Sequence, residues 1–412
     1  MSFGYNHHHL SYFAPQERSA LSLKSLAERF GTPLYVYDID DVLRRVRLLK
    51  SCFSNPLEIH YAMKANAHPF LLSALAKEGI GVDVVSAGEL KWALQHGHKA
   101  SHCVFSGVGK TKAEIRYALE SGIQQLNVES PEELQRIACI AKDLKQRAPV
   151  AFRMNPDVNA VTHPYIQTGF RENKFGMDFT FVTELKEILG KNRGSLDLKG
   201  LTLHIGSQIR DLGVFSEAIL KTKKIFKDFQ ESGFELKSFD VGGGLGINYQ
   251  EFASENEDQA LQDYGHLVQK CFEDLPGIRI LTEPGRILVG RMGMLLTEVQ
   301  YVKTTPFKKF CIVNTGMHHL LRPALYQATH RILPLDNSIK ADTIYDVVGP
   351  ICESSDVLGY DRQLPQVKEG DLLAVADVGA YGYTMANNYN MHPIPREVAL
   401  FEGQIVDSHL YS

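Results

Sequence analysis

The chain has 412 residues, of which 44% are hydrophobic and 22% are charged, with a formal net charge of −4. This length exceeds one ordinary core and predicts about two or three domains. The charge gives no basic surface for nucleic acid, and no run of eighteen apolar residues indicates a membrane span. We therefore expect small-molecule chemistry, with neither nucleic acid nor a membrane as partner.

Two features of the sequence favour a reducing compartment. The segment from Met1 to Ser11 lacks the pattern of a signal peptide, and no CxxC pair occurs, so we expect a cytoplasmic protein without a zinc site or a disulfide framework. We assign His7, His8 and His9 to a loose terminus rather than to a metal site, and expect no metal. The six scattered cysteines are Cys52, Cys103, Cys139, Cys271, Cys311 and Cys352.

Short β-rich runs alternate with segments that carry apolar residues at helical spacing. Eight such units predict an α/β fold with a closed parallel (β/α)8 barrel over residues 36–286. The expected helices include 69–78, 89–96, 112–120 and 131–145. The expected strands are 57–62, 82–85, 103–106, 125–128, 150–154, 201–204, 239–241 and 278–282.

Polar residues follow nearly every expected strand. The carboxyl ends of barrel strands meet at one mouth, where barrel enzymes hold their chemistry. Lys64 ends the first apolar run, and although a lysine there is more often a solvated surface charge, its place suggests a Schiff-base lysine. The residues at this mouth are Lys64, Asp83, Ser86, Ser106, Asn127, Glu129, Arg153, Asn155, His204, Gly242, Gly243, Gly244 and Glu283.

A second, β-rich domain is expected after the eighth unit. Shorter extended runs at 309–313, 344–348 and 372–376 are separated by Gly, Pro and Asn. The first 35 residues precede the eight strand–helix units of the barrel. The sequence therefore predicts a domain made of residues 1–35 together with 287–412, which contributes to the active site and to a dimer interface.

Two glycine-containing turns indicate phosphate binding. The runs 242–246 (GGGLG) and 283–286 (EPGR) place backbone amides at neighbouring strand ends, where a phosphate would fit. A dinucleotide fingerprint fails, because Ile247 and Tyr249 stand where GxGxxG requires glycine. From spacing alone, a glycine-rich turn without a ligand stays an alternative.

A series of ordered motifs extends over nearly the whole chain. They are GTPLY (31–35), YAMKAN (61–66), VFSGVGK (104–110), NPD (155–157), THPY (162–165), HIGSQ (204–208), GGGLG (242–246), EPGR (283–286), RPALY (322–326), CESSD (352–356) and GAY (379–381). In this order they resemble the diaminopimelate decarboxylases, within the alanine racemase-like barrel decarboxylases. The resemblance implies pyridoxal 5'-phosphate as cofactor and the conversion of meso-2,6-diaminopimelate to L-lysine and carbon dioxide, the last step of lysine biosynthesis.

The resemblance also assigns a cofactor site. It implies that Lys64 bonds covalently to the cofactor, that His204 stacks on its ring, and that Glu283 pairs with the pyridine nitrogen. A lysine attacks only when neutral, so we expect a setting that lowers its pKa. A core histidine and a salt-bridging glutamate are the ordinary alternatives. The implied cofactor-binding residues are Lys64, Asp83, His204, Ser207, Gly244, Glu283, Pro284, Gly285, Arg286 and Tyr381.

The substrate's distal carboxylate and ammonium groups need a forked cation and an anion, respectively. A surface ion pair is the alternative for either arginine among the residues involved. The residues implied for this end of the substrate are Arg286, Arg322, Tyr326, Glu353 and Tyr381.

Cys352 is the candidate proton donor after decarboxylation, because a thiol near its natural pKa can donate at neutral pH. The resemblance implies that the partner subunit supplies this segment, and therefore a homodimer with shared active sites. Ser355 stands where the family usually has glycine, and if a positive φ is needed there, serine costs about 1 kcal/mol.

Other functions stay open. A decarboxylase of ornithine, arginine or lysine would leave Arg286 and Arg322 without a partner carboxylate. A non-catalytic barrel that binds the cofactor would not need Cys352. Alanine racemase chemistry typically uses a tyrosine as second base, where this chain offers a thiol.

Overall fold

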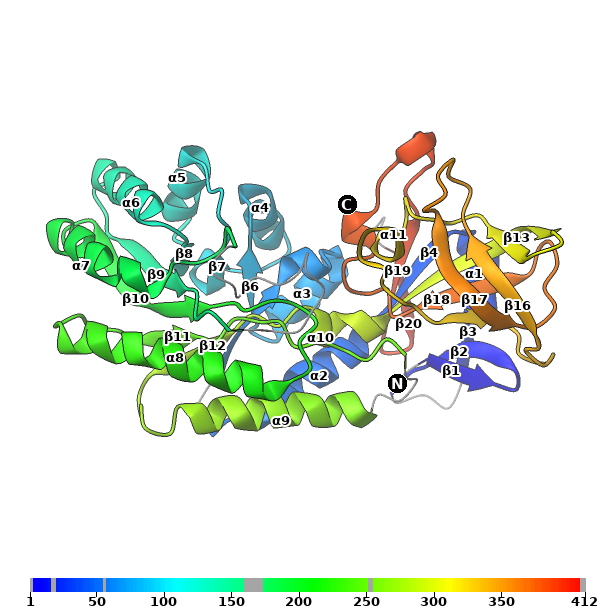
Figure 1. Ribbon diagram of the computed structural model, residues 1–412, viewed down its shortest axis with the longest axis horizontal. Coiled ribbons are helices and arrows are strands. Elements are labelled where there is room, and N and C mark those ends of the chain that lie inside the picture. Colours follow the sequence, from blue (N-terminus) through cyan, green and yellow to red (C-terminus); the bar gives the residue numbers. More distant parts are fainter. Residues whose placement is uncertain (1–2, 16–19, 55–56, 159–172, 251–254, 408–412) are drawn as a thin grey trace.

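The computed structural model describes residues 3–15, 20–54, 57–158, 173–250 and 255–407. It consists of a barrel surrounded by helices and a β-rich body beside it (Figure 1). The THPY motif at 162–165 lies outside the described residues.

Eight strands close into a barrel in the order β10-β11-β12-β5-β6-β7-β8-β9, and every neighbouring pair is parallel. The predicted (β/α)8 barrel is therefore confirmed. β10 begins five residues earlier than expected, because the half-buried Asp197 and Lys199 alternate there with buried leucines. The strands are β5 (Leu57–Ala62), β6 (Gly81–Val84), β7 (Cys103–Phe105), β8 (Gln125–Val128), β9 (Ala148–Met154), β10 (Leu196–Leu203), β11 (Ser238–Asp240) and β12 (Arg279–Thr282).

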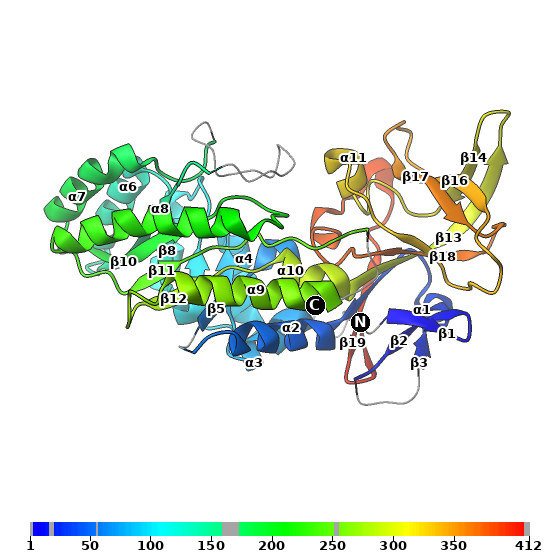
Figure 2. The same cartoon turned by 60° about the horizontal axis from the view of Figure 1, so that its bottom comes forward.

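Helices follow the strands and cover the outside of the barrel (Figure 2). α6 shows why they form: Ser130 Oγ accepts from the N–H of Glu133 at 3.1 Å, Pro131 occupies the first turn, and Leu134 and Ile137 are buried on one face. The helices are α2 (Ile39–Ser51), α3 (Pro69–Lys77), α4 (Ala87–Gln95), α5 (Lys112–Glu120), α6 (Pro131–Asp143), α7 (Val182–Lys191), α8 (Leu212–Glu231), α9 (Glu255–Cys271) and α10 (Arg286–Val289).

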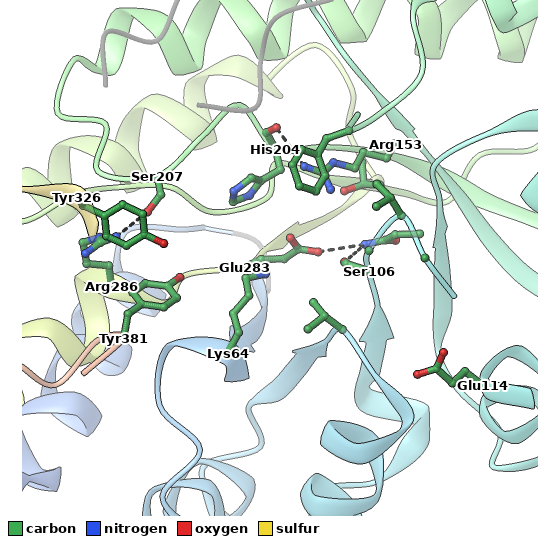
Figure 3. A pocket seen from close by; sticks show the side chains of 17 residues that line it. Lys64, Ser106, Glu114, Arg153, His204, Ser207, Glu283, Arg286, Tyr326 and Tyr381 are labelled. Atoms are coloured by element: carbon green, nitrogen blue, oxygen red, sulfur yellow. Dashed lines mark hydrogen bonds between the residues drawn. The ribbon is translucent and has the colours of Figure 1, made fainter. Parts of the chain in front are cut away.

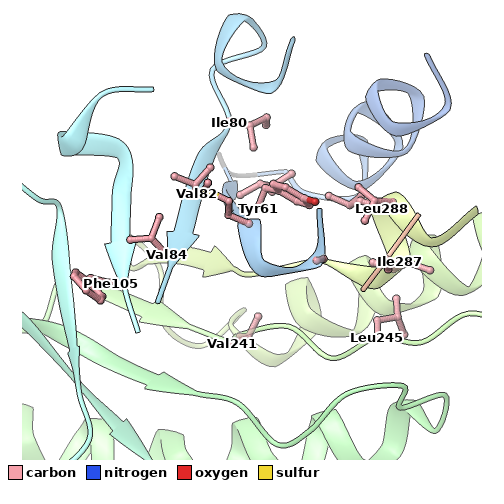
Figure 4. Packing of buried hydrophobic residues seen from close by; sticks show 14 of the residues in the cluster. Tyr61, Ile80, Val82, Val84, Phe105, Val241, Leu245, Ile287 and Leu288 are labelled. Atoms are coloured by element: carbon pink, nitrogen blue, oxygen red, sulfur yellow. The ribbon is translucent and has the colours of Figure 1, made fainter. Parts of the chain in front are cut away.

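The two faces of a barrel strand serve different purposes, as β6 shows. Asp83 contacts Lys64 at the barrel mouth, so its neighbours Val82 and Val84 point to the opposite face. Both valines are fully buried in the main hydrophobic core, with Tyr61 and Leu288 nearby (Figure 4). Burial of these apolar side chains holds the strand in the register that presents Asp83 to the site.

The β-rich body is built around β13, which pairs with β4, β14 and β18. Its main sheet has the order β17-β16-β14-β13-β4-β19-β20, with β15 and β18 off this path. The predicted boundary between residues 35 and 36 falls inside β4. The elements are β4 (Leu34–Asp38), β13 (Gly293–Thr304), β14 (Lys309–Val313), α11 (Arg322–Tyr326), β15 (Ile332–Pro334), β16 (Thr343–Val348), β17 (Val357–Leu364), β18 (Leu372–Ala376), β19 (Arg396–Phe401) and β20 (Gln404–Asp407).

The N-terminal segment packs on this body. It forms a small sheet of β1 (Phe3–Asn6), β2 (His9–Phe13) and β3 (Ala20–Ser22), followed by α1 (Leu23–Phe30). Leu10 and Tyr12 share a hydrophobic cluster with residues of β4, β13, β18 and β19. In the described part of the chain, no cluster of three or more His, Cys, Asp or Glu could hold a metal ion, and no helix is long and apolar enough to cross a membrane.

Buried ion pairs join the two bodies. Arg291, just after α10, donates to Glu257 of α9 at 2.9 Å and to Asp377 at the end of β18 at 2.9 Å. Arg45 of α2 reaches the same Glu257 at 3.3 Å, and Arg331 donates to Asp377. Removing one member of such a network leaves an unpaired buried charge, which costs about 3–5 kcal/mol. The network therefore fixes how the barrel mouth faces the β-rich body.

Candidate active site

A cavity of about 550 Å³ opens at the barrel mouth. Its wall is formed by residues that follow the barrel strands, completed by Tyr326 and Tyr381 of the β-rich body (Figure 3). The cavity therefore lies where both bodies meet, at the carboxyl ends of the strands.

Lys64 lies in a short 3-10 turn (η1, Met63–Ala65) directly after β5. Its Nζ donates to Asp83 Oδ2 at 2.8 Å, and its side chain faces the cavity. Burial alone would lower the pKa of Lys64, but the charges of Asp83 and Glu283 raise it above its usual value. The prediction that the site lowers the pKa of Lys64 is therefore wrong for the free amine, because the charged neighbours of Lys64 are carboxylates rather than cations.

Glu283 follows β12 and is 5% exposed. Burial, then the charges of Asp240 and Asp83, raise the pKa of Glu283 well above its usual value. Asn127 Nδ2 donates to its Oε1 at 3.1 Å and to Ser106 Oγ at 2.9 Å. The charge of Lys64 opposes this rise only in part, and a protonated ring nitrogen would supply a further cation for this buried carboxyl group.

His204 follows β10 and lies on the far side of the Glu283 carboxyl group from Lys64 (Figure 3). Burial, then the charges of Arg153 and Lys64, lower the pKa of His204 well below its usual value, so the imidazole is neutral. Arg153 is itself held by Glu129 at 2.7 Å. A neutral imidazole face opposite a lysine amine is suited to a flat aromatic ring between them.

The glycine run after β11 allows close approach of three backbone segments. A Cβ on Gly243 would lie 2.1 Å from Glu283 O, and one on Gly244, at a φ of +113°, would lie 2.3 Å from Gly206 O. Only glycine fits these positions. Within the described chain, the N–H groups of Arg286 and Ile287 donate no backbone hydrogen bond, as is usual for the first turn of a helix. These groups are free to meet a phosphate.

Two buried arginines lie near the β-rich side of the cavity. Arg286 donates to Tyr249 Oη at 2.7 Å and to Ser207 Oγ at 3.0 Å, and Arg322 donates to His330 Nε2 at 2.7 Å. Among the described residues, neither guanidinium forms an ion pair with a carboxylate, and the Nε of each lacks a partner. Buried cations need anions, so this side of the cavity is suited to phosphate and carboxylate groups.

The structure brings most of the predicted site residues together. Asp83 contacts Lys64, and Gly244, Pro284 and Gly285 belong to the glycine-containing turns. Arg322 does not line the cavity but contacts the ring of Tyr249, whose hydroxyl group accepts a hydrogen bond from Arg286. The predicted residues that line the cavity are Lys64, His204, Ser207, Glu283, Arg286, Tyr326 and Tyr381.

Cys352 and Glu353 are the exceptions. Both are exposed, and neither lines the cavity of its own chain. Tyr389 Oη donates to Glu353 Oε1 at 2.7 Å. Ser355 does not adopt a positive φ, so serine causes no backbone strain there.

The sequence pattern did not assign Tyr249 or His330 to the site. Tyr249 lies beyond the glycine run, and His330 lies in a loop between α11 and β15. Their place in the site is seen from the contacts that Tyr249 makes with Arg286 and that His330 makes with Arg322 in the folded protein. The position of Asn127 and Arg153 at predicted strand ends indicated that they belong to the site. Their hydrogen-bond partners, Glu283 and Glu129, could not be predicted from the sequence.

Residues 39–290 match the family described as pyridoxal-dependent decarboxylase, pyridoxal binding domain. The chain is 41% identical over 385 residues to the diaminopimelate decarboxylase of Aquifex aeolicus, which covers 93% of this chain and 90% of that one. It is 42% identical over 395 residues to that of Vibrio cholerae, at 94% and 93% coverage. The chain belongs to the diaminopimelate decarboxylase family.

A solved structure agrees with this membership in the family. The diaminopimelate decarboxylase from Helicobacter pylori, complexed with L-lysine, superposes with a TM-score of 0.87 at 41% identity, covering 93% of this chain and 95% of that chain. The resemblance drawn from the motifs is thereby confirmed. The site also fits pyridoxal 5'-phosphate, the cofactor of this family: an amine, a buried carboxyl group and a flat imidazole line one cavity, and the glycine run packs against the backbone of Glu283.

Proposed function

We propose that this protein is a carboxy-lyase that converts meso-2,6-diaminopimelate to L-lysine and carbon dioxide with pyridoxal 5'-phosphate, as the last step of lysine biosynthesis. The observation that carries the proposal is that Lys64, beside Asp83, and Arg286 line one cavity, with the buried Arg322 next to Arg286 on the Tyr249 ring. Among the described residues, neither arginine has a carboxylate partner. The L-lysine complex of the Helicobacter pylori relative supports it.

The cofactor, when bound, accepts the electrons left behind by the departing carboxyl group. We assign its covalent attachment to Lys64, contact with its ring face to His204, and its pyridine nitrogen to Glu283. Phosphate binding is assigned to Gly244, the backbone of residues 283–286, Ser207 and Tyr381. The Asp83 carboxylate holds the Lys64 amine by accepting the 2.8 Å hydrogen bond described above.

The distal end of the substrate carries a carboxylate and an ammonium group. We assign the carboxylate to Arg286, Arg322 and Tyr326, because no carboxylate of the described residues pairs with either arginine. Tyr381 stands between this side and Lys64, and its ring lies against Arg286, with the guanidinium carbon 4.9 Å from the ring centroid. An amino acid with one carboxylate would leave a buried cation unpaired.

We assign the proton that replaces the lost carboxyl group to the Cys352 thiol, and recognition of the distal ammonium to Glu353. Both side chains are exposed and outside the cavity of their own chain. This arrangement supports a homodimer in which each subunit supplies these two residues to the cavity of its partner. We place this homodimer in the cytoplasm, as the lack of a signal-peptide pattern and of CxxC pairs suggests.

The decisive experiment offers the cofactor-loaded protein meso-diaminopimelate, L-lysine, L-ornithine and L-arginine in parallel and identifies the products by mass spectrometry. We expect L-lysine from diaminopimelate and no diamine from the other three. A diamine product would reassign the distal site to another basic amino acid, and no product from any of them would favour a non-catalytic barrel.

Shared active sites are tested by mixing two inactive variants, Lys64→Ala and Cys352→Ala. Random exchange of subunits makes half of the dimers mixed, each with one intact site, so about a quarter of wild-type activity should return. Sites formed within one subunit would regain none.

A further inference from the structure

His330 has two hydrogen bonds that fix its protonation. It is fully buried between β18 and the cavity, with 0% exposure. Arg322 can only donate, so His330 Nε2, at 2.7 Å, must accept. The proton must then lie on Nδ1, which donates to Ala376 O at 2.9 Å. His330 is therefore a neutral imidazole in one tautomer, and its lone pair points at the Arg322 guanidinium.

Besides His330, the Arg322 guanidinium interacts with Tyr249. Its guanidinium carbon lies 4.6 Å from the centroid of the Tyr249 ring, which sets its plane, and the 2.7 Å hydrogen bond to His330 Nε2 adds a direction. The Tyr249 ring in turn packs edge-on to His330, with centroids 5.1 Å apart. Among the described residues, no carboxylate holds Arg322, and its Nε lacks a partner.

We propose that His330 is a positioning residue that aims the Arg322 guanidinium at the distal carboxylate of the substrate, and that it thereby selects diamino dicarboxylates over diamino monocarboxylates. An imidazole suits this task better than a carboxylate. A carboxylate would neutralise Arg322 and compete with the substrate, whereas a neutral acceptor orients the cation and leaves its charge available. This inference rests on the proposed function of the cavity.

Two variants separate the two hydrogen bonds of the ring. In His330→Asn, the amide can replace Nδ1 and donate to Ala376 O, but it is too short to accept from Arg322. In His330→Gln, the longer side chain reaches the position of Nε2 and can accept. Both variants place a polar group in the same buried site, so each is the control for the other.

The kinetic test uses the cofactor-loaded enzyme, with KM and kcat for meso-diaminopimelate and two inhibition constants. L-lysine, the product, keeps the distal carboxylate, whereas 1,5-diaminopentane lacks it. We expect His330→Asn to raise KM about 10- to 100-fold, the equivalent of one lost hydrogen bond to a charged group, with kcat within about threefold. The inhibition constant of L-lysine should rise with KM, that of 1,5-diaminopentane should change less than about twofold, and His330→Gln should stay within about threefold of wild type in KM.

Three outcomes would overturn the proposal: an unchanged KM in His330→Asn, a parallel rise of KM and of the 1,5-diaminopentane constant, or a glutamine variant no better than asparagine. If either variant does not fold, neutron diffraction of the wild-type protein decides, because a proton on His330 Nε2 excludes acceptance from Arg322. Failure of the proposed function can be told apart from failure of the His330 proposal, because the wild-type protein would then not turn over diaminopimelate. Calorimetric binding of that compound to wild type and the two variants would still test His330.

Discussion

Replacement of Asn127 by leucine tests whether the buried polar network beneath the cavity controls the Glu283 carboxyl group. Asn127 is 1% exposed, and its Nδ2 donates to Glu283 Oε1 at 3.1 Å. Gln125 Nε2 donates to Asn127 Oδ1 at 2.7 Å, so the orientation of the amide is fixed. Leucine has nearly the same shape and removes only the polar atoms.

A buried hydrogen bond to a charged group contributes about 1.5–3 kcal/mol, and 1.36 kcal/mol corresponds to a factor of ten in rate. If catalysis requires Glu283 as a carboxylate opposite the ring nitrogen, Asn127→Leu should lower kcat about 10- to 100-fold. Losing a donor destabilises the charged form and raises the pKa of Glu283, so the acidic limb of the kcat profile should move to higher pH.

The assay is steady-state kinetics between pH 5.5 and 9, roughly the range in which proteins are most stable, together with the visible spectrum and cofactor content of each preparation. Cofactor content near wild type shows that the cavity is intact. A variant with wild-type kcat and an unshifted acidic limb would refute the role of this hydrogen bond, whatever its effect on thermal stability.

Three further changes test other parts of the site and the fold. Lys64→Ala should abolish turnover and the visible absorption of the bound cofactor, while Lys77→Ala on the exposed end of α3 keeps both; turnover retained by the first variant would exclude the assignment. Cys352→Ala should lower kcat at least about tenfold with unchanged cofactor content, as expected for the loss of a general acid, and unchanged turnover would remove the thiol from the reaction. Burial raises the pKa of Glu397 to about 7 despite its bonds to tyrosines. Because the folded state binds this proton more tightly, stability is full below pH ~4.5 and falls by roughly 3 kcal/mol as pH rises to ~7. In denaturant unfolding, Glu397→Gln should lose correspondingly less stability than wild type over this pH range. The same dependence of stability on pH in both proteins would contradict this prediction.

The barrel could be predicted because its signals are local. Each strand is a short, mostly apolar run with a polar residue near its carboxyl end, either within the strand, as Asp83 in β6, or directly after it, as Glu283 after β12. The sheet of the β-rich body could not be predicted in this way. Its β4 and β19 pair in parallel, with Leu34 opposite Arg396, although the two strands stand near opposite ends of the chain. No pattern within either strand specifies such a partner.

The chemistry of the site divides along the same line. The identity and place of Lys64 followed from its position after β5, but the direction of its pKa did not, because that depends on Asp83 and Glu283 brought within range by folding. His330 is the extreme case: it is linked to the site by an arginine eight residues earlier, by an acceptor on β18 and by the ring of Tyr249. A histidine in a loop carries no sequence signal of that role.

The turn that carries Lys64 is held from the β-rich body, which explains why one cavity needs both. Asn66 Nδ2 donates to Gly379 O at 3.0 Å, and the N–H of Tyr381 donates to Ala65 O at 2.8 Å. The segment after β18 is thus bonded to the two residues that directly follow Lys64, and it also presents the Tyr381 ring to Arg286. Movement of the β-rich body would shift the amine and the arginine side of the cavity together. The distance between the reacting end and the distal end of a bound substrate is therefore set by the packing of the two bodies, rather than by the barrel alone.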